Sequence, residues 1–129
     1  MREITDHKLN GLNDALTIQA MDVPGSGGAN HLYDIRWPAG APDASPDMCG
    51  PESFMVRFQN GPIKEAGVNG ISGEALLAIV IDRLRGFQSG EYKCRENAIA
   101  LTQIEDGLMW LQKRTRDRLA RGVEGTMAK

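Results

Sequence analysis

Arginine side chains gather near the C-terminal end of the sequence, in the stretch RTRDRLARGVEGT between Arg114 and Thr126. On a helix, Arg114, Arg118 and Arg121 fall at i, i+4 and i+7 and therefore lie close together along one side. Three guanidinium groups so close together repel one another, and a phosphate held bidentately by these forks would relieve the repulsion. A basic last helical turn that complements the helix dipole accounts for the same spacing. Spacing alone therefore leaves two interpretations open, an anion-binding row and a structural helix end.

A long helix is predicted to carry this row. It is expected to begin between Cys94 and Glu96 and to end at Arg121, where Gly122 provides a C-cap. Ahead of the arginines, apolar residues and one threonine recur at intervals of three and four, as on the packed side of an amphipathic helix. This seam consists of Leu101, Ile104, Leu108, Leu111 and Thr115.

A shorter helix precedes it and completes an antiparallel hairpin. Ser72 is a suitable N-cap and Gly86 a suitable C-cap, so Phe87 is expected in the turn between the two helices. The predicted inward residues of this helix are Leu76, Leu77, Val80, Ile81 and Leu84. The seam of the longer helix extends beyond its shorter partner, and such an uncovered apolar stripe predicts self-assembly.

Strands are predicted in the N-terminal part of the chain, at residues 15–21, 30–37 and 52–59, as a small antiparallel meander that needs a helical cover. Residues 1–13 are expected to form a loosely held lead-in, the proline-rich residues 38–51 an exposed excursion, and residues 64–70 a turn. The predicted fold class is therefore α+β. A β-rich N-terminal part spans residues 1–61, and a helical hairpin with a basic C-terminal tail spans residues 62–129.

Composition excludes several classes of protein. With 129 residues the chain has the size of one domain, and a net charge of −2 provides no overall basic field for nucleic acid. The polar first residues are unlike a signal peptide, and no run of ~18 apolar residues indicates a transmembrane helix. Cys49 and Cys94 stand far apart without histidine companions, which favours two reduced thiols over a disulfide or a zinc site. We therefore expect a cytosolic protein.

Catalytic motifs are absent from the sequence. It contains no HExxH or GxSxG pattern, and Glu105 and Asp106, as neighbours on a helix, point apart. Three classes stay open: a phosphate- or nucleotide-binding module, a purely structural oligomer, and a helix-turn-helix DNA-binding protein. The last would need base-reading side chains besides its cations.

Three stretches resemble a family of phage proteins: FQNGPIKEAGVNG (58–70), CRENAIAL (94–101) and RTRDRLARGVEGT (114–126). The family comprises sponges that defeat the bacterial Thoeris defence and share a helical-hairpin domain with shorter sponges directed against CBASS. The N-terminal strands resemble the longer, anti-Thoeris members. The resemblance implies a non-enzymatic protein that sequesters cyclic nucleotide signals in the cytoplasm of the infected host. The signal is glycocyclic ADP-ribose for the anti-Thoeris branch, and hairpin relatives bind cyclic di- and trinucleotides. It implies a homo-oligomer, a hexamer rather than a dimer, with ligand pockets between subunits and no cofactor, metal, membrane or DNA partner.

The resemblance also implies roles for individual residues. Arg114 and Arg118 would clamp the phosphates, Phe87 would stack on a base, and Asn97 would bind a base edge or ribose. The segment from Gly122 to Thr126 resembles the part of hexameric relatives that holds a cyclic trinucleotide. The complete set of expected nucleotide-binding residues is Phe87, Asn97, Arg114, Arg118, Arg121, Arg57, Lys64, Gly125 and Thr126.

Overall fold

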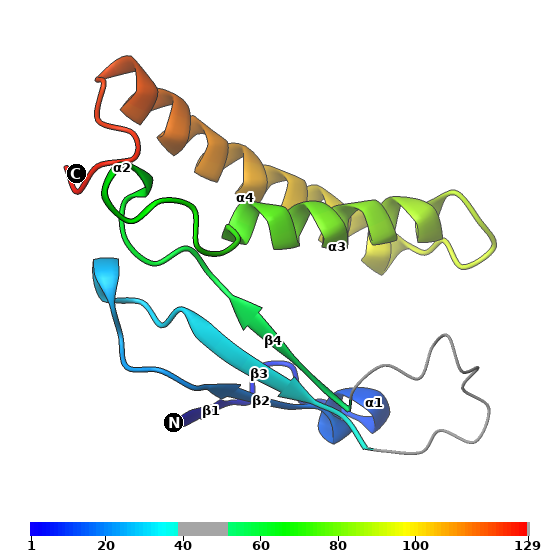
Figure 1. Ribbon diagram of the computed structural model, residues 1–129. Helices are drawn as coiled ribbons and strands as arrows, with labels where there is room; N and C mark the ends of the chain where they lie inside the picture. Colours follow the sequence, from blue (N-terminus) through cyan, green and yellow to red (C-terminus); the bar gives the residue numbers. More distant parts are fainter. Residues whose placement is uncertain (39–51, 129) are drawn as a thin grey trace. The chain divides into compact units, whose positions relative to one another are not determined.

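The computed structural model of the protein describes residues 1–38 and 52–128 (Figure 1). The chain divides into two compact units, Met1–Gly61 and Pro62–Lys129. The first unit contains an antiparallel β-sheet and the second a pair of long helices, so the predicted α+β class is confirmed. Apart from Pro38, the predicted proline-rich excursion lies outside the described residues.

Four strands form the sheet of the first unit, in the order β1 (Arg2–Ile4), β2 (Thr17–Ala20), β3 (Leu32–Arg36) and β4 (Ser53–Arg57). All neighbouring strands are antiparallel, and the β3–β4 register sets Tyr33 opposite Val56. Ala20 and Val56 are buried, whereas the outer strand β4 leaves Phe54 and Met55 half exposed. The meander predicted from alternating residues is therefore present, with one strand more than expected.

The extra strand corrects the expectation of a loosely held lead-in. Strand β1 pairs with β2, with Ile4 opposite Ile18. A short helix, α1 (Gly11–Ala15), follows and begins within the residues expected to be a lead-in. A strand of three residues is too short to show an alternating pattern in the sequence. It forms because its backbone pairs with the free edge of β2.

The Asp22 carboxylate organises the connection between β2 and β3. It accepts hydrogen bonds from the backbone N–H groups of His31, at 3.0 Å, and Leu32, at 3.2 Å, and from the Asn30 amide. Burial raises the pKa of this carboxyl, but the hydrogen bonds outweigh burial and leave the pKa of Asp22 below its ordinary value. The imidazole of His31 is buried against Gly25, where an added Cβ would lie 3.0 Å from the ring Cε1. This corner holds the two central strands in register.

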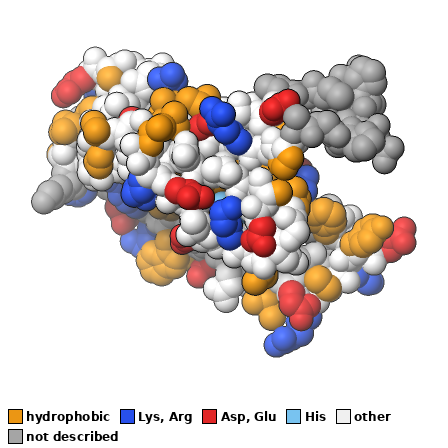
Figure 2. Space-filling model, turned by 90° about the horizontal axis from the view of Figure 1, so that it is seen from below, with side chains coloured by type: hydrophobic (Ala, Val, Ile, Leu, Met, Phe, Trp, Pro, Cys, Tyr) orange, Lys and Arg blue, Asp and Glu red, His pale blue; other side chains and the backbone are white. Residues whose placement is uncertain are grey.

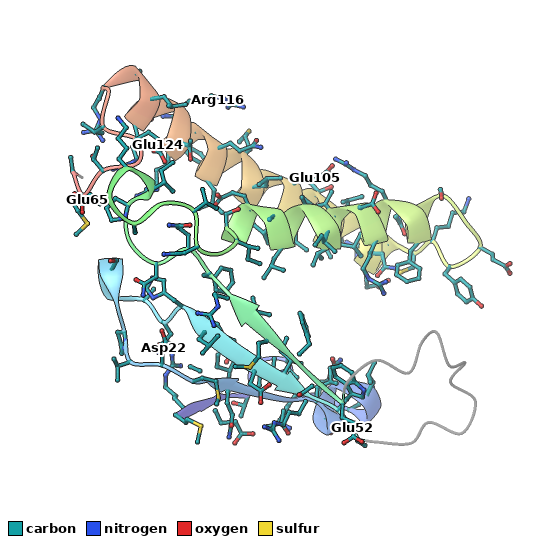
Figure 3. All side chains as sticks on the ribbon, viewed as in Figure 1. Asp22, Glu52, Glu65, Glu105, Arg116 and Glu124 are labelled. Atoms are coloured by element: carbon teal, nitrogen blue, oxygen red, sulfur yellow. The ribbon has the colours of Figure 1, made fainter. Side chains whose placement is uncertain are left out.

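Helices α3 (Gly73–Gln88) and α4 (Arg95–Ala120) form the predicted hairpin in the second unit, after the short helix α2 (Ile63–Ala66). The Ser72 hydroxyl caps α3 by accepting a hydrogen bond from the Ala75 N–H at 3.1 Å. An ion pair of 2.7 Å between Arg85 and Glu105 joins the two helices, and Figure 3 shows Glu105 on the middle of α4. The bounds of α4 agree with those predicted for the long helix.

The shorter helix differs from its prediction in two respects. Val80 is 41% exposed, because α3 packs against a single helix and only a narrow stripe around the buried Ile81 is covered. The helix also continues past Gly86 to Gln88, since the Ser89 N–H still bonds to the carbonyl of Arg85 at 3.1 Å. Phe87 therefore lies in the last helical turn and not in the loop.

The short helix α2 lies where a turn was predicted. Most of it falls within residues 64–70, so this part of the expectation is wrong. Within the described ranges, no helix is both long enough and apolar enough to cross a membrane.

Candidate functional site

An open groove of ≈ 430 Å³ runs along the C-terminal half of α4. Its lining side chains all come from this one helix and recur at helical spacing: Trp110, Lys113, Arg114, Asp117, Arg118 and Arg121. The structure thus brings the three arginines of the predicted row together on one side of the helix. Three groove residues, Trp110, Lys113 and Asp117, were not among the predicted site residues. The position of Trp110 one turn ahead of Arg114 is the signal that identifies it.

The charges in the groove are unequally balanced. Lys113 pairs with Asp117 at 2.8 Å, and Arg118 pairs with Glu124 at 2.9 Å. Within residues 1–38 and 52–128, Arg114 and Arg121 have no ion pair, and both are exposed. An anion that enters the groove therefore meets two uncompensated guanidinium groups.

An exposed indole lies beside these cations. The side chain of Trp110 is 59% exposed, on the side of α4 opposite the packed seam. A flat π-system next to guanidinium groups is suited to a ligand that combines a planar base with phosphates. Arg114 and Trp110 are one helical turn apart, so one ligand can contact both.

Arg118 differs from its neighbours because it is buried, at 7% exposure. Its Nε donates to Glu124, its Nη2 donates to the carbonyls of Val123 at 3.0 Å and Thr126 at 3.1 Å, and its Nη1 donates to the Ala128 carbonyl. Four of its five N–H donors are thus used within the chain. The expected phosphate contact of Arg118 stays a prediction, with one donor left for it.

The C-terminal residues 122–128 fold back and lie against α2. The Lys64 N–H donates to the Gly125 carbonyl at 3.3 Å, and an added Cβ at Gly125 would meet Ile63 at 3.0 Å. Gly125 also has a φ of 79°, a value that disfavours other residues. The Thr126 hydroxyl donates to the Val123 carbonyl. The structure therefore brings Lys64, Gly125 and Thr126 together at one end of the hairpin.

Phe87 and Asn97 lie at the other end of the hairpin, where α3 gives way to α4. The Arg83 guanidinium stands 5.5 Å from the centroid of the Phe87 ring, which is 41% exposed. The Asn97 N–H donates to the Sγ of Cys94, the N-cap of α4, at 3.4 Å. Asn97 and Arg114 are thus separated by roughly 25 Å along the helix axis, at ~1.5 Å per residue. One chain does not bring these expected residues together.

Comparison with known proteins agrees with this hairpin. Residues 50–116 match the family model described as Acb2/Tad1, hairpin domain. The chain belongs to the Acb2/Tad1 hairpin family. It is also 57% identical over 74 residues to a protein named Thoeris anti-defense 1 from Bacillus phage SBSphiJ7. That match covers 57% of this chain and 52% of the relative, so the similarity spans about half of the relative's length. The predicted relationship to anti-Thoeris sponges is confirmed.

The Acb2/Tad1 match includes Phe87, Asn97 and Arg114 but ends before Arg118. Arg57 also lies within the matched range, as the last residue of β4 in the first unit. In the part of the chain that the structure describes, no group of three or more His, Cys, Asp or Glu side chains is placed to hold a metal ion. The side chains that line the groove offer cationic and aromatic contacts to a ligand.

Proposed function

We propose that the chain is a phage anti-defence sponge, which binds a cyclic nucleotide immune signal such as glycocyclic ADP-ribose and holds it uncleaved. The observation that carries the proposal is the groove on α4, where Arg114, Arg121 and an exposed indole face one hollow. Membership of the Acb2/Tad1 hairpin family and the name of the phage relative support it. Such a protein acts in the cytoplasm of the infected host, where the signal is made.

Each part of the ligand has a counterpart in the groove. The forks of Arg114 and Arg121 bind the pyrophosphate, because a planar guanidinium donates two parallel hydrogen bonds to phosphate oxygens. The Trp110 indole lies one turn away and offers a flat apolar surface to the ligand. Stacking of a base on an aromatic side chain contributes ~1–3 kcal/mol in single-stranded nucleic-acid binders.

A second copy of the chain completes the pocket. Phe87 and Asn97 are too far from Arg114 within one chain for a single cyclic nucleotide to contact all three. In an antiparallel pair of α4 helices, the N-terminal half of one helix lies beside the C-terminal half of the other. Asn97 of one copy then lies near the arginine row of its partner.

The outward side of α4 suits such a pair. Exposed residues recur there at i, i+4, i+7 and i+11, namely Ile99, Gln103, Asp106 and Trp110. Between Glu96 and Asp106 the charged residues are acidic, namely Glu96, Glu105 and Asp106, although Arg95 begins the helix; between Trp110 and Arg121 the cations Lys113, Arg114, Arg116, Arg118 and Arg121 outnumber the single anion Asp117. Antiparallel pairing therefore sets acidic residues of one copy beside basic residues of the other.

Apolar exposure also supports an assembly. Among the described apolar side chains only Ala20, Val56 and Ile81 are buried in the single chain. Figure 2 shows hydrophobic side chains reaching the surface in several places on the face it presents. Burial of apolar surface stabilises an interface by about 25 cal/mol per Å². We propose a homo-oligomer, a hexamer rather than a dimer, as the resemblance implies.

A second pocket is proposed at residues 122–126 for cyclic di- or trinucleotides. The backbone N–H groups of Glu124 and Gly125 make no hydrogen bond within the described chain, and consecutive N–H groups beside a left-handed glycine bind anions. Lys64, whose own N–H holds the Gly125 carbonyl, adds positive charge. The Thr126 hydroxyl keeps the role that the family resemblance implies. Arg57, which ends β4 in the first unit, stays an expected nucleotide-binding residue on the basis of that resemblance alone.

Isothermal titration calorimetry tests binding, and mass spectrometry of the ligand tests turnover. We expect glycocyclic ADP-ribose to bind with sub-micromolar affinity and to be recovered intact after the protein is heat-denatured. Cyclic dinucleotides, cyclic triadenylate and linear ADP-ribose complete the panel, and linear ADP-ribose controls for simple charge attraction. Recovery of linear or hydrolysed product indicates an enzyme and overturns the proposal. No binding of any cyclic nucleotide favours the alternative, a purely structural oligomer.

A further inference from the structure

We infer that Arg118 is a positioning residue, which holds the C-terminal segment, Gly122–Ala128, in the shape that binds the second ligand. This inference rests on the proposed function, because the ligand of that segment is proposed there. The role inferred for Arg118 differs from that of Arg114, although both arginines belong to one helical row.

The contacts of Arg118 carry the inference. Its guanidinium is buried and donates to four acceptors, all within residues 123–128: the Glu124 carboxylate and the carbonyls of Val123, Thr126 and Ala128. A planar fork reaches several fixed acceptors at once, whereas the single ammonium of lysine does not. Figure 3 shows Glu124 in the segment that folds back beyond the end of α4. Arg118 thus joins the segment to the helix along nearly its whole length.

In the part of the chain that the structure describes, few other hydrogen bonds join the segment to the rest of the second unit. The Val123 N–H donates to the Arg118 carbonyl at 3.0 Å, and the Gly125 carbonyl accepts from the Lys64 N–H at 3.3 Å. Among the described residues, the other hydrogen bonds of the segment lie within it or join Gly122 to the last turn of α4. Loss of the Arg118 guanidinium therefore removes most of the hydrogen bonds that fix residues 124–128.

Charge gives a second reason. The Glu124 carboxylate belongs to the segment whose free N–H groups are proposed to bind a phosphate. An uncompensated carboxylate there would repel the phosphate, and the 2.9 Å ion pair with Arg118 compensates it. Arg118 thus supplies both the shape and the electrostatic balance of the second pocket.

Hydrogen exchange and calorimetry on Arg118→Lys test the inference. We expect exchange of the hydrogen-bonded amides of the segment, those of Val123, Thr126 and Ala128, to accelerate ~10-fold or more, while α4 amides before residue 114 remain protected. Affinity for cyclic triadenylate should fall roughly tenfold or more, whereas affinity for glycocyclic ADP-ribose should change less than about threefold. Arg114→Ala, the matched variant one turn earlier, should show the reverse selectivity and unchanged exchange. Glu124→Gln, a milder variant, should show a smaller acceleration in the same amides.

Each possible result decides one part of the inference. Unchanged exchange in Arg118→Lys and Glu124→Gln overturns the positioning role. Accelerated exchange with unchanged triadenylate affinity shows that the segment is not part of a binding site. Equal losses for both ligands identify Arg118 as a direct ligand contact instead. If the wild-type protein binds no cyclic trinucleotide, the proposed second pocket fails, and exchange alone still decides whether Arg118 positions the segment.

Discussion

Replacing Arg114 by alanine tests the groove most directly, because this side chain is exposed and has no ion pair among the described residues. A hydrogen bond to a charged group is worth ~1.5–3 kcal/mol, which corresponds to roughly 10- to 100-fold in dissociation constant. Solvent screens an open groove and favours the lower figure, whereas closure by a second copy favours the higher one. We expect at least a tenfold loss of affinity for glycocyclic ADP-ribose, with little change in melting temperature.

Arg116→Ala is the matched control. Arg116 is the same residue type on the same helix and is also exposed, but it lines a separate hollow with Glu74, Gln112 and Thr115. Figure 3 labels Arg116 on the C-terminal half of α4. The two substitutions remove the same charge from two sides of one helix, and calorimetry compares their effects on ligand affinity. Equal losses of affinity would show that net charge alone attracts the ligand, and no loss in Arg114→Ala would refute the groove assignment.

The double substitution of Arg114 and Arg118 is a less informative experiment. From spacing alone, removal of two like charges one helical turn apart should hardly lower stability, because it relieves repulsion. In the structure, however, Arg118 pairs with Glu124 and donates to three carbonyls. Its removal takes a charged donor away from four part-buried acceptors, so a change in the double variant mixes lost ligand contacts with a loosened segment.

Three other predictions concern separate parts of the molecule. Phe87→Ala should weaken glycocyclic ADP-ribose binding roughly tenfold without changing the charge, since stacking contributes ~1–3 kcal/mol, and unchanged affinity in calorimetry would remove Phe87 from the site. Trp110→Glu should lower the mass measured by light scattering, because it places an extra negative charge on the proposed antiparallel interface, while circular dichroism shows an intact hairpin; an unchanged mass contradicts that interface. The folded protein lowers the pKa of Asp22, so its contribution to stability is complete above the ordinary carboxyl pKa of 3.8 and is lost as the pH falls through the lowered value. Asp22→Asn should therefore reduce the pH dependence of the melting temperature below about pH 4, unlike Asp14→Asn, which removes an exposed carboxylate, and equal effects would contradict the role of Asp22.

The sequence by itself predicted the helical hairpin and the bounds of its long helix. Those features depend on local information, namely apolar residues at helical spacing, a cap at Ser72 and a glycine after Arg121. The strands β2, β3 and β4 followed from alternation for a similar reason. Family resemblance, carried by short local motifs, indicated the sponge family that the hairpin match then confirmed.

Other features depended on contacts between residues that no local pattern connects. Strand β1 exists because β2 offers an edge to pair with, and α3 continues through Phe87 because the Ser89 N–H finds a helical acceptor beyond Gly86. Most clearly, Arg114 and Arg118 are equivalent in spacing but differ in the structure. The chain turns back after Gly122 and brings four acceptors to Arg118, whereas Arg114 stays free of such contacts in the described chain. Periodicity determines the side of a helix on which a side chain lies, but only the tertiary path of the chain determines which acceptors reach it.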